Sequence, residues 1–158
     1  KKIAFIHGED TSVTKKRFVG FNRALSENGI TVPDEYLIEA DYHNPDCSRT
    51  ATRQLMELPN PPSAIMYPDD YSYIGGLMEL ERMHIKIPEN VSVVGYDGIA
   101  LSQYLHPVLT TYRQDTEEMG KISAKKLIET IEHRKTCEAE TLYIRGKLLE
   151  GHSVKQLL

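Results

Sequence analysis

Several classes of protein are excluded by what this chain of 158 residues lacks. It has no tryptophan and only two cysteines, Cys47 and Cys137, which lie far apart without the C-x-x-C spacing of zinc or redox sites. No apolar run approaches the roughly 20 residues that cross a bilayer. The formal net charge of −4 argues against a nucleic-acid surface within this chain. We therefore expect a protein of a reducing, cytoplasmic setting, without a membrane segment.

The motifs of common α/β enzymes and cofactor sites are also missing. No G-x-G-x-x-G follows a predicted strand, and the six histidines show no H-E-x-x-H or comparable spacing. The segment Gly151–Lys155 fails the G-x-S-x-G pattern of a nucleophile, because Lys155 replaces the last glycine. We therefore predict no catalytic residue, no metal and no cofactor, and a binding protein rather than an enzyme.

Short apolar runs alternate with amphipathic segments along the chain. Strands are predicted at 2–7, 37–42, 64–67, 91–97 and 109–113, and helices follow at 11–28, 44–58, 69–83, 101–105 and 115–134. A last strand, broken at Gly146, is predicted over 140–150. This alternation predicts an α/β fold with a doubly wound, mostly parallel sheet and helices on both faces.

The most informative position is Asp97. It follows a buried, β-branched run from Val91 to Val94, and Gly95 and Gly98 on either side allow the backbone to turn sharply. Open parallel sheets bind their ligands at the carboxyl ends of the strands. Asp97 is therefore predicted to contact a ligand, although capping of the next helix explains a carboxylate there equally well.

Other polar side chains are predicted along the same edge of the sheet. His7, Tyr42 and Asp69 stand at the ends of predicted strands. Arg17 lies in the first turn of a helix, where the macrodipole disfavours a cation, so a polar ligand would explain it; a solvated arginine is the commoner alternative. Together these groups suit a polyhydroxylated ligand. Capping by Asp69 and edge packing by Tyr42 remain open as alternatives.

Five segments resemble the effector-binding core of LacI-type transcriptional repressors, which is similar in fold to periplasmic sugar-binding proteins. They are Ile3–Gly8, Thr14–Phe21, Ala64–Asp70, Ile87–Asp97 and Leu109–Gln114. The resemblance covers nearly the whole chain and implies the type I periplasmic-binding-protein-like fold. Arg17 then matches the family's sugar-binding arginine, Asp97 its acidic ligand and Tyr42 an aromatic wall. Asp69 stands where many members carry Asn, a departure that replaces a donor and acceptor with an acceptor alone.

The resemblance also divides the chain. Residues 1–114 would be the C-terminal effector-binding subdomain, 115–146 a crossover helix and strand that pack on an N-terminal subdomain absent here, and 147–158 a return segment. Without an initiator methionine, the chain is expected to be a fragment with weak sugar affinity. The apolar stripe of the crossover helix should be unusually exposed or covered by a second copy. It consists of Ala124, Leu127, Ile128 and Ile131.

The function implied is that of a regulator that binds a small-molecule effector, a sugar, and reaches operator DNA only through a headpiece absent from this chain. A homodimer is implied too, with contacts from the helix after Asp69 and the short helix after Asp97. The expected contacts are Tyr71, Tyr73, Leu77, Leu80 and Leu101, although packing against the sheet explains several of them equally well. Two alternatives stay open: a periplasmic sugar receptor, which needs an upstream secretion signal, and a small α/β enzyme using Asp69 and Asp97.

Overall fold

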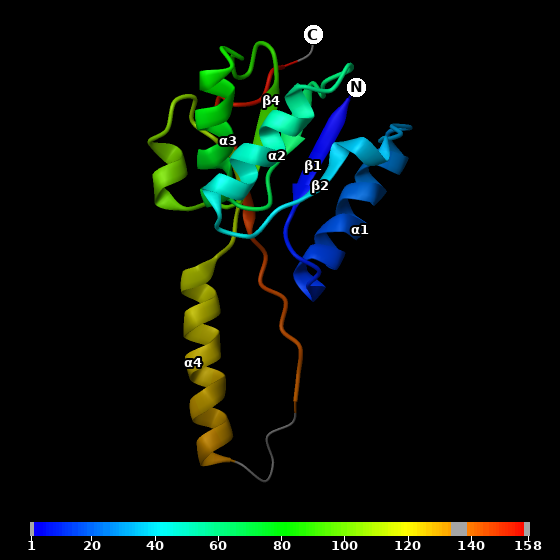
Figure 1. Cartoon of the computed structure of the whole chain (residues 1–158). Coiled ribbons are helices and arrows are strands. Elements are labelled where there is room, and N and C mark those ends of the chain that lie inside the picture. Colours follow the sequence, from blue (N-terminus) through cyan, green and yellow to red (C-terminus); the bar gives the residue numbers. More distant parts are fainter. Residues whose placement is uncertain (1, 134–138, 157–158) are drawn as a thin grey trace.

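The computed structural model describes residues 2–133 and 139–156, so Cys137 and Arg134, the predicted end of the long helix, lie outside the described residues (Figure 1). The strands are β1 (Ile3–His7), β2 (Leu37–Glu39), β3 (Ala64–Met66), β4 (Ser92–Asp97), β5 (Thr110–Arg113) and β6 (Lys147–Leu149). The α-helices are α1 (Ser12–Glu27), α2 (Pro45–Met56), α3 (Asp70–Arg82) and α4 (Thr116–Glu132). Two 3₁₀ turns, η1 (Asp34–Tyr36) and η2 (Ala100–Gln103), complete the description.

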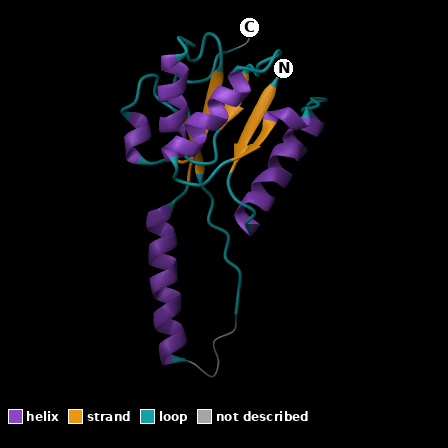
Figure 2. Ribbon diagram, viewed as in Figure 1, coloured by secondary structure: helices purple, strands orange, loops and turns teal. Residues whose placement is uncertain are grey.

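The strands form one sheet in the order β2-β1-β3-β4-β5-β6 (Figure 2). All neighbours are parallel except β6, which runs antiparallel to β5. The predicted fold class, a mostly parallel α/β sheet, is therefore confirmed. Because the parallel strands end at one edge, the loops after β1, β3, β4 and β5 meet there.

Helices cover the two faces of the sheet, as the alternating side chains of β1 show. Phe5 points to one face and packs with Phe21 and Leu25 of α1. Ala4 and Ile6 point to the other face and join the larger core under α2 and α3. Each large apolar side chain buried in this way stabilises the fold by about 1.5–3 kcal/mol. The doubly wound arrangement thus follows from the period of two along the strands.

The helix starts follow from capping residues in the sequence. Thr11 accepts a hydrogen bond from the Thr14 amide, and Asn44 accepts one from the amide of Cys47, with proline at the first helical position. Asp115 caps α4 in the same way. The predicted starts of these three helices are confirmed to within two residues. Each cap of this kind contributes about 1 kcal/mol and fixes where a helix leaves the edge of the sheet.

Three predicted elements differ from the structure. Residues 141–145 run without regular structure, and only Lys147–Leu149 after Gly146 pairs with β5, because no other strand lies beside the earlier residues in the described chain. The second strand ends at Glu39 rather than at 42, where the chain turns toward the Asn44 cap. The predicted helix at 101–105 is the 3₁₀ turn η2.

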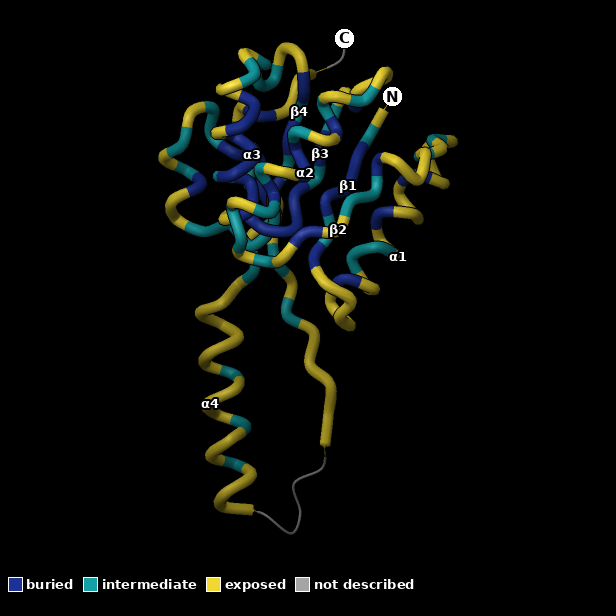
Figure 3. Tube along the Cα trace, in the orientation of Figure 1, coloured by how far each residue is buried: buried dark blue, intermediate teal, exposed yellow. Residues whose placement is uncertain are grey.

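Helix α4 and residues 139–146 project away from the sheet (Figures 1 and 3). None of the helix's described residues is buried. Leu127, Ile128 and Ile131 are 62%, 55% and 70% exposed, which confirms the expectation of an uncovered apolar stripe. Within the described residues, no helix has the length and apolar character required to cross a membrane.

Candidate functional site

A cleft of about 1050 Å³ opens at the carboxyl edge of the sheet. Its walls come from the first turns of α1, the loop after β2, the turn after β4 and the junction between β5 and α4. Such a crevice is where open α/β sheets bind ligands. Segments that are far apart in the sequence thus supply one site.

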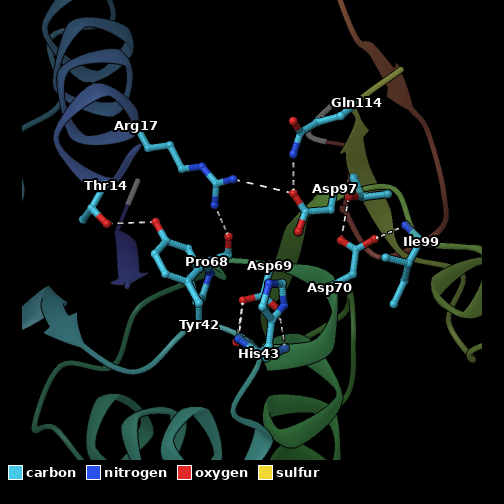
Figure 4. Close-up of polar contacts among 12 residues, drawn as sticks. Thr14, Arg17, Tyr42, His43, Pro68, Asp69, Asp70, Asp97, Ile99 and Gln114 are labelled. Atoms are coloured by element: carbon cyan, nitrogen blue, oxygen red, sulfur yellow. Dashed lines mark hydrogen bonds and ion pairs between the residues drawn. The ribbon is translucent and has the colours of Figure 1, made fainter. Parts of the chain in front are cut away.

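Arg17 and Asp97 meet in this cleft (Figure 4). The Arg17 Nη2 atom lies 3.6 Å from Asp97 Oδ1, and the two side chains are only 12% and 22% exposed. Arg17 Nη1 donates to the carbonyl oxygen of Pro68. The guanidinium carbon is also 3.8 Å from the centroid of the Tyr96 ring and 5.3 Å from that of Tyr42. These contacts fix the guanidinium in one orientation before any ligand arrives.

The backbone at Asp97 is held in an unusual conformation. Asp97 has a φ of 103°, a region that residues other than glycine rarely occupy, and Gly98 follows with a φ of 68°. A Cβ atom added at Gly98 would lie 2.4 Å from the Cβ of Arg113, so the neighbouring strand leaves room only for glycine. The paired glycines predicted a sharp turn here, and the structure contains one.

Two neighbours control the charge of the Asp97 carboxylate. Burial raises its pKa above the ordinary value, while a hydrogen bond from Gln114 and the positive charge of Arg17 oppose that shift. Gln114 Nε2 donates to Asp97 Oδ1 at 2.6 Å. The carboxylate is therefore partly desolvated, oriented and paired.

Asp70 anchors the turn that carries Asp97. It is fully buried, and burial raises its pKa, while hydrogen bonds from Thr111 and from the Ile99 amide lower it. Thr111 Oγ1 donates at 2.6 Å and the Ile99 nitrogen at 2.9 Å. Asp70 thus ties β5 and the residues after β4 to the start of α3, and it is the support of the site rather than part of its surface.

Tyr42 lines the cleft as predicted, and its ring lies against Gly8, where an added Cβ would come within 2.0 Å of it. Its hydroxyl is 2.9 Å from the Thr14 hydroxyl. Asp69 has a different place: it is fully buried, caps α3 through the Ser72 amide and accepts a hydrogen bond from the His43 amide. The capping alternative is confirmed, and Asp69 supports the loop from which Tyr42 and His43 reach the cleft.

His7 does not line the cleft in the structure. Its ring packs edge-on against Phe5 and Phe18 at centroid distances of 5.9 and 5.4 Å, and Nδ1 donates to the Gly8 carbonyl. His7 shares the α1 face with Phe5 because side chains two apart on a strand point the same way. The sequence correctly predicted that His7 stands at the end of a strand, but the prediction that its side chain faces the cleft was wrong.

Sequence reasoning missed Tyr96, Gln114 and His43 as parts of the site. Gln114 could have been found, because it directly follows a strand that ends at the same edge. Tyr96 stands next to Asp97 in a strand, where alternation places it on the opposite face, and only the turn at Asp97 brings both to one cleft. His43 has a φ of 54°, which no short motif announces.

The predicted dimer contacts fall into two groups. Tyr73, Leu77 and Leu80 are 0%, 9% and 0% exposed and belong to the core of their own chain. Tyr71 and Leu101 are each 45% exposed and remain available to a partner. Packing against the sheet, the alternative left open above, therefore accounts for the first three.

Comparison with known proteins identifies the family. The model of the periplasmic binding protein-like domain matches residues 1–154. The chain belongs to this family. The PurR transcriptional repressors of Mannheimia succiniciproducens and Vibrio atlanticus are 32% and 33% identical to it over 99% of this chain. Those alignments cover 47% and 46% of the repressors, so the chain spans about half the length of the curated relatives it matches.

Solved structures in the same family agree with this assignment. A putative LacI transcriptional regulator from Bacillus cereus superposes with a TM-score of 0.94 at 31% identity, over 100% of this chain and 56% of that one. A complex of the regulator CelR with cellobiose gives 0.88 at 28% identity, over 96% of this chain and 46% of that chain. A LacI family regulator from Enterococcus faecium with bound ribose gives a TM-score of 0.87 at 27% identity, over 99% of this chain and 57% of that chain.

Proposed function

We propose that this chain is the effector-binding part of a LacI-type transcriptional regulator, and that its effector is a small molecule of sugar type. The observation that carries the proposal is the oriented Arg17–Asp97 pair in a cleft at the carboxyl edge, beside two tyrosine rings. A carboxylate accepts hydrogen bonds from hydroxyl groups, a guanidinium donates to ring and hydroxyl oxygens, and an aromatic ring covers an apolar sugar face. Relatives named as repressors, and two similar structures that hold cellobiose and ribose, support it.

The uncovered stripe on α4 supports the division of the chain that the resemblance implies. Residues 1–114 would form the effector-binding subdomain, 115–146 the elements that pack on a second subdomain, and 147–158 the return segment. An effector bound between the two subdomains would favour a closed arrangement. In the cytoplasmic, homodimeric regulator, closure would then change affinity for operator DNA through a separate headpiece.

Two other functions share parts of this architecture. A periplasmic transport receptor requires a secretion signal, whereas a regulator requires a helix-turn-helix, so the amino terminus encoded by the full open reading frame separates them. An enzyme using Asp69 and Asp97 lacks support, because Asp69 is engaged in capping α3. The enzyme alternative would require that the chain turns over some member of a substrate panel and that Asp97→Asn abolishes this turnover.

A nuclear magnetic resonance titration of the chain tests the proposal, since it detects even the millimolar affinity expected of half a cleft. Monosaccharides, disaccharides and their phosphorylated forms should shift the amide signals of residues around Arg17 and Asp97. Asp97→Asn should weaken the binding about tenfold or more, because hydrogen bonds to a charged group are lost. Arg23→Gln, an exposed substitution elsewhere on α1, should leave it unchanged. Shifts confined to other surfaces, or no shifts with the whole panel, would contradict the proposal.

A further inference from the structure

The charges that line the cleft differ from those of the chain as a whole. The sequence has more acidic than basic residues, 23 against 19. The cleft has the opposite balance, with Lys16, Arg17 and Arg113 against the single carboxylate of Asp97. Positive charge is thus concentrated where the ligand is proposed to bind.

The Asp97 carboxylate does not neutralise this excess. It is already paired with Arg17 and hydrogen-bonded to Gln114. Within residues 2–133 and 139–156, neither Lys16 nor Arg113 forms an ion pair, whereas the neighbouring Lys15 is 3.1 Å from Asp10. Two positive charges at the cleft are therefore left without a counterion.

The two unpaired cations flank the Arg17–Asp97 pair. Lys16 precedes Arg17 in α1 and lines the same wall. Arg113 is the register partner of Asp97 in the β4–β5 ladder, and its stem packs against Gly98. A ligand held by the central pair would therefore share the cleft with a lysine of α1 and an arginine of β5.

The basic lining continues beyond Arg113. A second hollow of about 140 Å³ adjoins it, lined by Arg145 and Lys147 as well as Asp115. Lys147 is the register partner of Arg113 in the β5–β6 ladder. Asp115 caps α4 through the Glu118 amide, so the helix terminus already engages it. At this end of the cleft, three basic side chains therefore stand against the one carboxylate of Asp115.

Like charges gathered in a partly enclosed cleft repel one another, and a neutral sugar would leave that repulsion in place. We infer that the effector is a sugar that carries an anionic group, a phosphate or a carboxylate. Its hydroxyls contact Arg17 and Asp97, and its anionic oxygens lie between Lys16 and Arg113. This inference rests on the proposed function and adds the chemical class of the effector.

The test compares sugars that differ only in charge, by the same titration of the whole chain. The probes are glucose, glucose 6-phosphate, glucuronate, ribose, ribose 5-phosphate and inorganic phosphate. We expect at least one anionic sugar to bind about tenfold more tightly than its neutral counterpart, and to weaken as the ionic strength rises from about 0.01 M to about 0.15 M, where the Debye length falls from about 30 to about 8 Å. Binding of the neutral sugars should not change with salt.

Matched variants assign the effect to the two cations. Lys16→Ala and Arg113→Gln should each weaken binding of the anionic sugar about fivefold more than binding of its neutral counterpart. Lys15→Ala removes a charge one residue away that is paired with Asp10, and it should have no effect on either sugar. Both cleft positions are exposed, and dispersed amide signals will show that the variants fold.

Four results would overturn the inference. Equal affinity for neutral and charged sugars would overturn the inference but leave the proposed function standing. Anionic sugars that bind both cleft variants as tightly as the wild type would have the same consequence. Inorganic phosphate that binds as tightly as the sugar phosphates would show a patch that attracts any anion. The absence of cleft shifts with every probe would contradict the proposed function as well.

Discussion

At the scale of single residues, the site depends on a backbone conformation that costs stability. A residue other than glycine at positive φ costs about 1–3 kcal/mol, and Asp97 has a φ of 103°. Gln114 donates a hydrogen bond to the Asp97 side chain, and Asp70 accepts one from the Ile99 amide in the turn that follows. The surrounding hydrogen bonds therefore maintain a strained position that presents the carboxylate to the cleft.

Gln114→Ala should raise the pKa of Asp97 further, because it removes the hydrogen bond that opposes burial. An acid whose pKa is higher in the folded than in the unfolded state stabilises the fold only at low pH, where it is protonated. This contribution is lost as pH rises from the pKa of the unfolded state, 3.8, to that of the folded state. The variant should therefore lose more stability than the wild type as pH rises above 3.8. Carbon-detected titration of the Asp97 carboxyl measures the pKa directly.

Gln103→Ala is the matched control for this variant. Gln103 also lines the cleft, but its amide donates to the Ser102 hydroxyl and the Leu109 carbonyl instead of to Asp97. If both variants moved the Asp97 titration equally, the specific role of Gln114 would be refuted.

At the scale of elements, one buried carboxylate joins α2 to α3. Glu79 of α3 is fully buried and accepts hydrogen bonds from Arg49 and Arg53 of α2, at 2.9 and 2.6 Å, and from Arg82 of its own helix. These guanidinium groups hold the pKa of Glu79 well below its ordinary value of 4.5. The pair of helices on this face is therefore fastened by charge as well as by apolar packing.

Glu79→Gln should destabilise the fold by about 2 kcal/mol at pH 7, because the guanidinium groups of Arg49, Arg53 and Arg82 lose the buried anion that they share. We discount larger figures since the three arginines are 37%, 41% and 51% exposed and solvent screens them. A depressed pKa stabilises the fold above the unfolded value of 4.5, and this contribution is lost as pH falls below it. The difference between wild type and variant, measured by urea unfolding, should therefore shrink below about pH 4.

Glu81→Gln removes an exposed carboxylate from the same helix and serves as the control. It should change the unfolding free energy by less than about 0.5 kcal/mol. A gap between wild type and Glu79→Gln that stays constant with pH would argue against an ionised Glu79.

Elements governed by local chemistry were predictable from the sequence, and those governed by pairing were not. The caps at Thr11 and Asn44 and the buried strands depend on neighbouring residues. The burial of Glu79 depends on which helices pack together, and the missing strand at 141–145 depends on a neighbour to pair with. Neither condition is visible in a single stretch of sequence.

The same distinction applies to the site. The rule that strand ends share an edge brought Arg17 and Asp97 together correctly. It did not determine side-chain directions, so His7 turned into an aromatic cluster and Asp69 into a helix cap. Tyr96, which lies against the guanidinium, depends on the unusual φ of the next residue.

At the scale of the whole molecule, the chain consists of a packed sheet domain and a helix that packs on little of it. The buried apolar residues belong to the two clusters on the faces of the sheet, and α4 contributes to neither in the described chain. Removing apolar groups from α4 should therefore lower the unfolding free energy less than removing them from the core.

Leu127→Ser and Ile131→Ser should each change the unfolding free energy of the sheet domain by less than about 0.5 kcal/mol. Leu80→Ala, by contrast, removes a fully buried side chain and should cost about 2–5 kcal/mol. Urea unfolding followed by circular dichroism measures both. A loss above about 1 kcal/mol in the α4 variants would show that the stripe is covered, and sedimentation equilibrium would report whether a second copy covers it.

Gln114 and Thr116 line the cleft where the chain departs for α4, and Leu149 lines it from β6, the strand that follows the projecting segment. A molecule seated in the cleft therefore touches the root of the projecting arm itself. A change in how the cleft is filled would therefore act on Gln114 and Thr116 directly, at the start of α4.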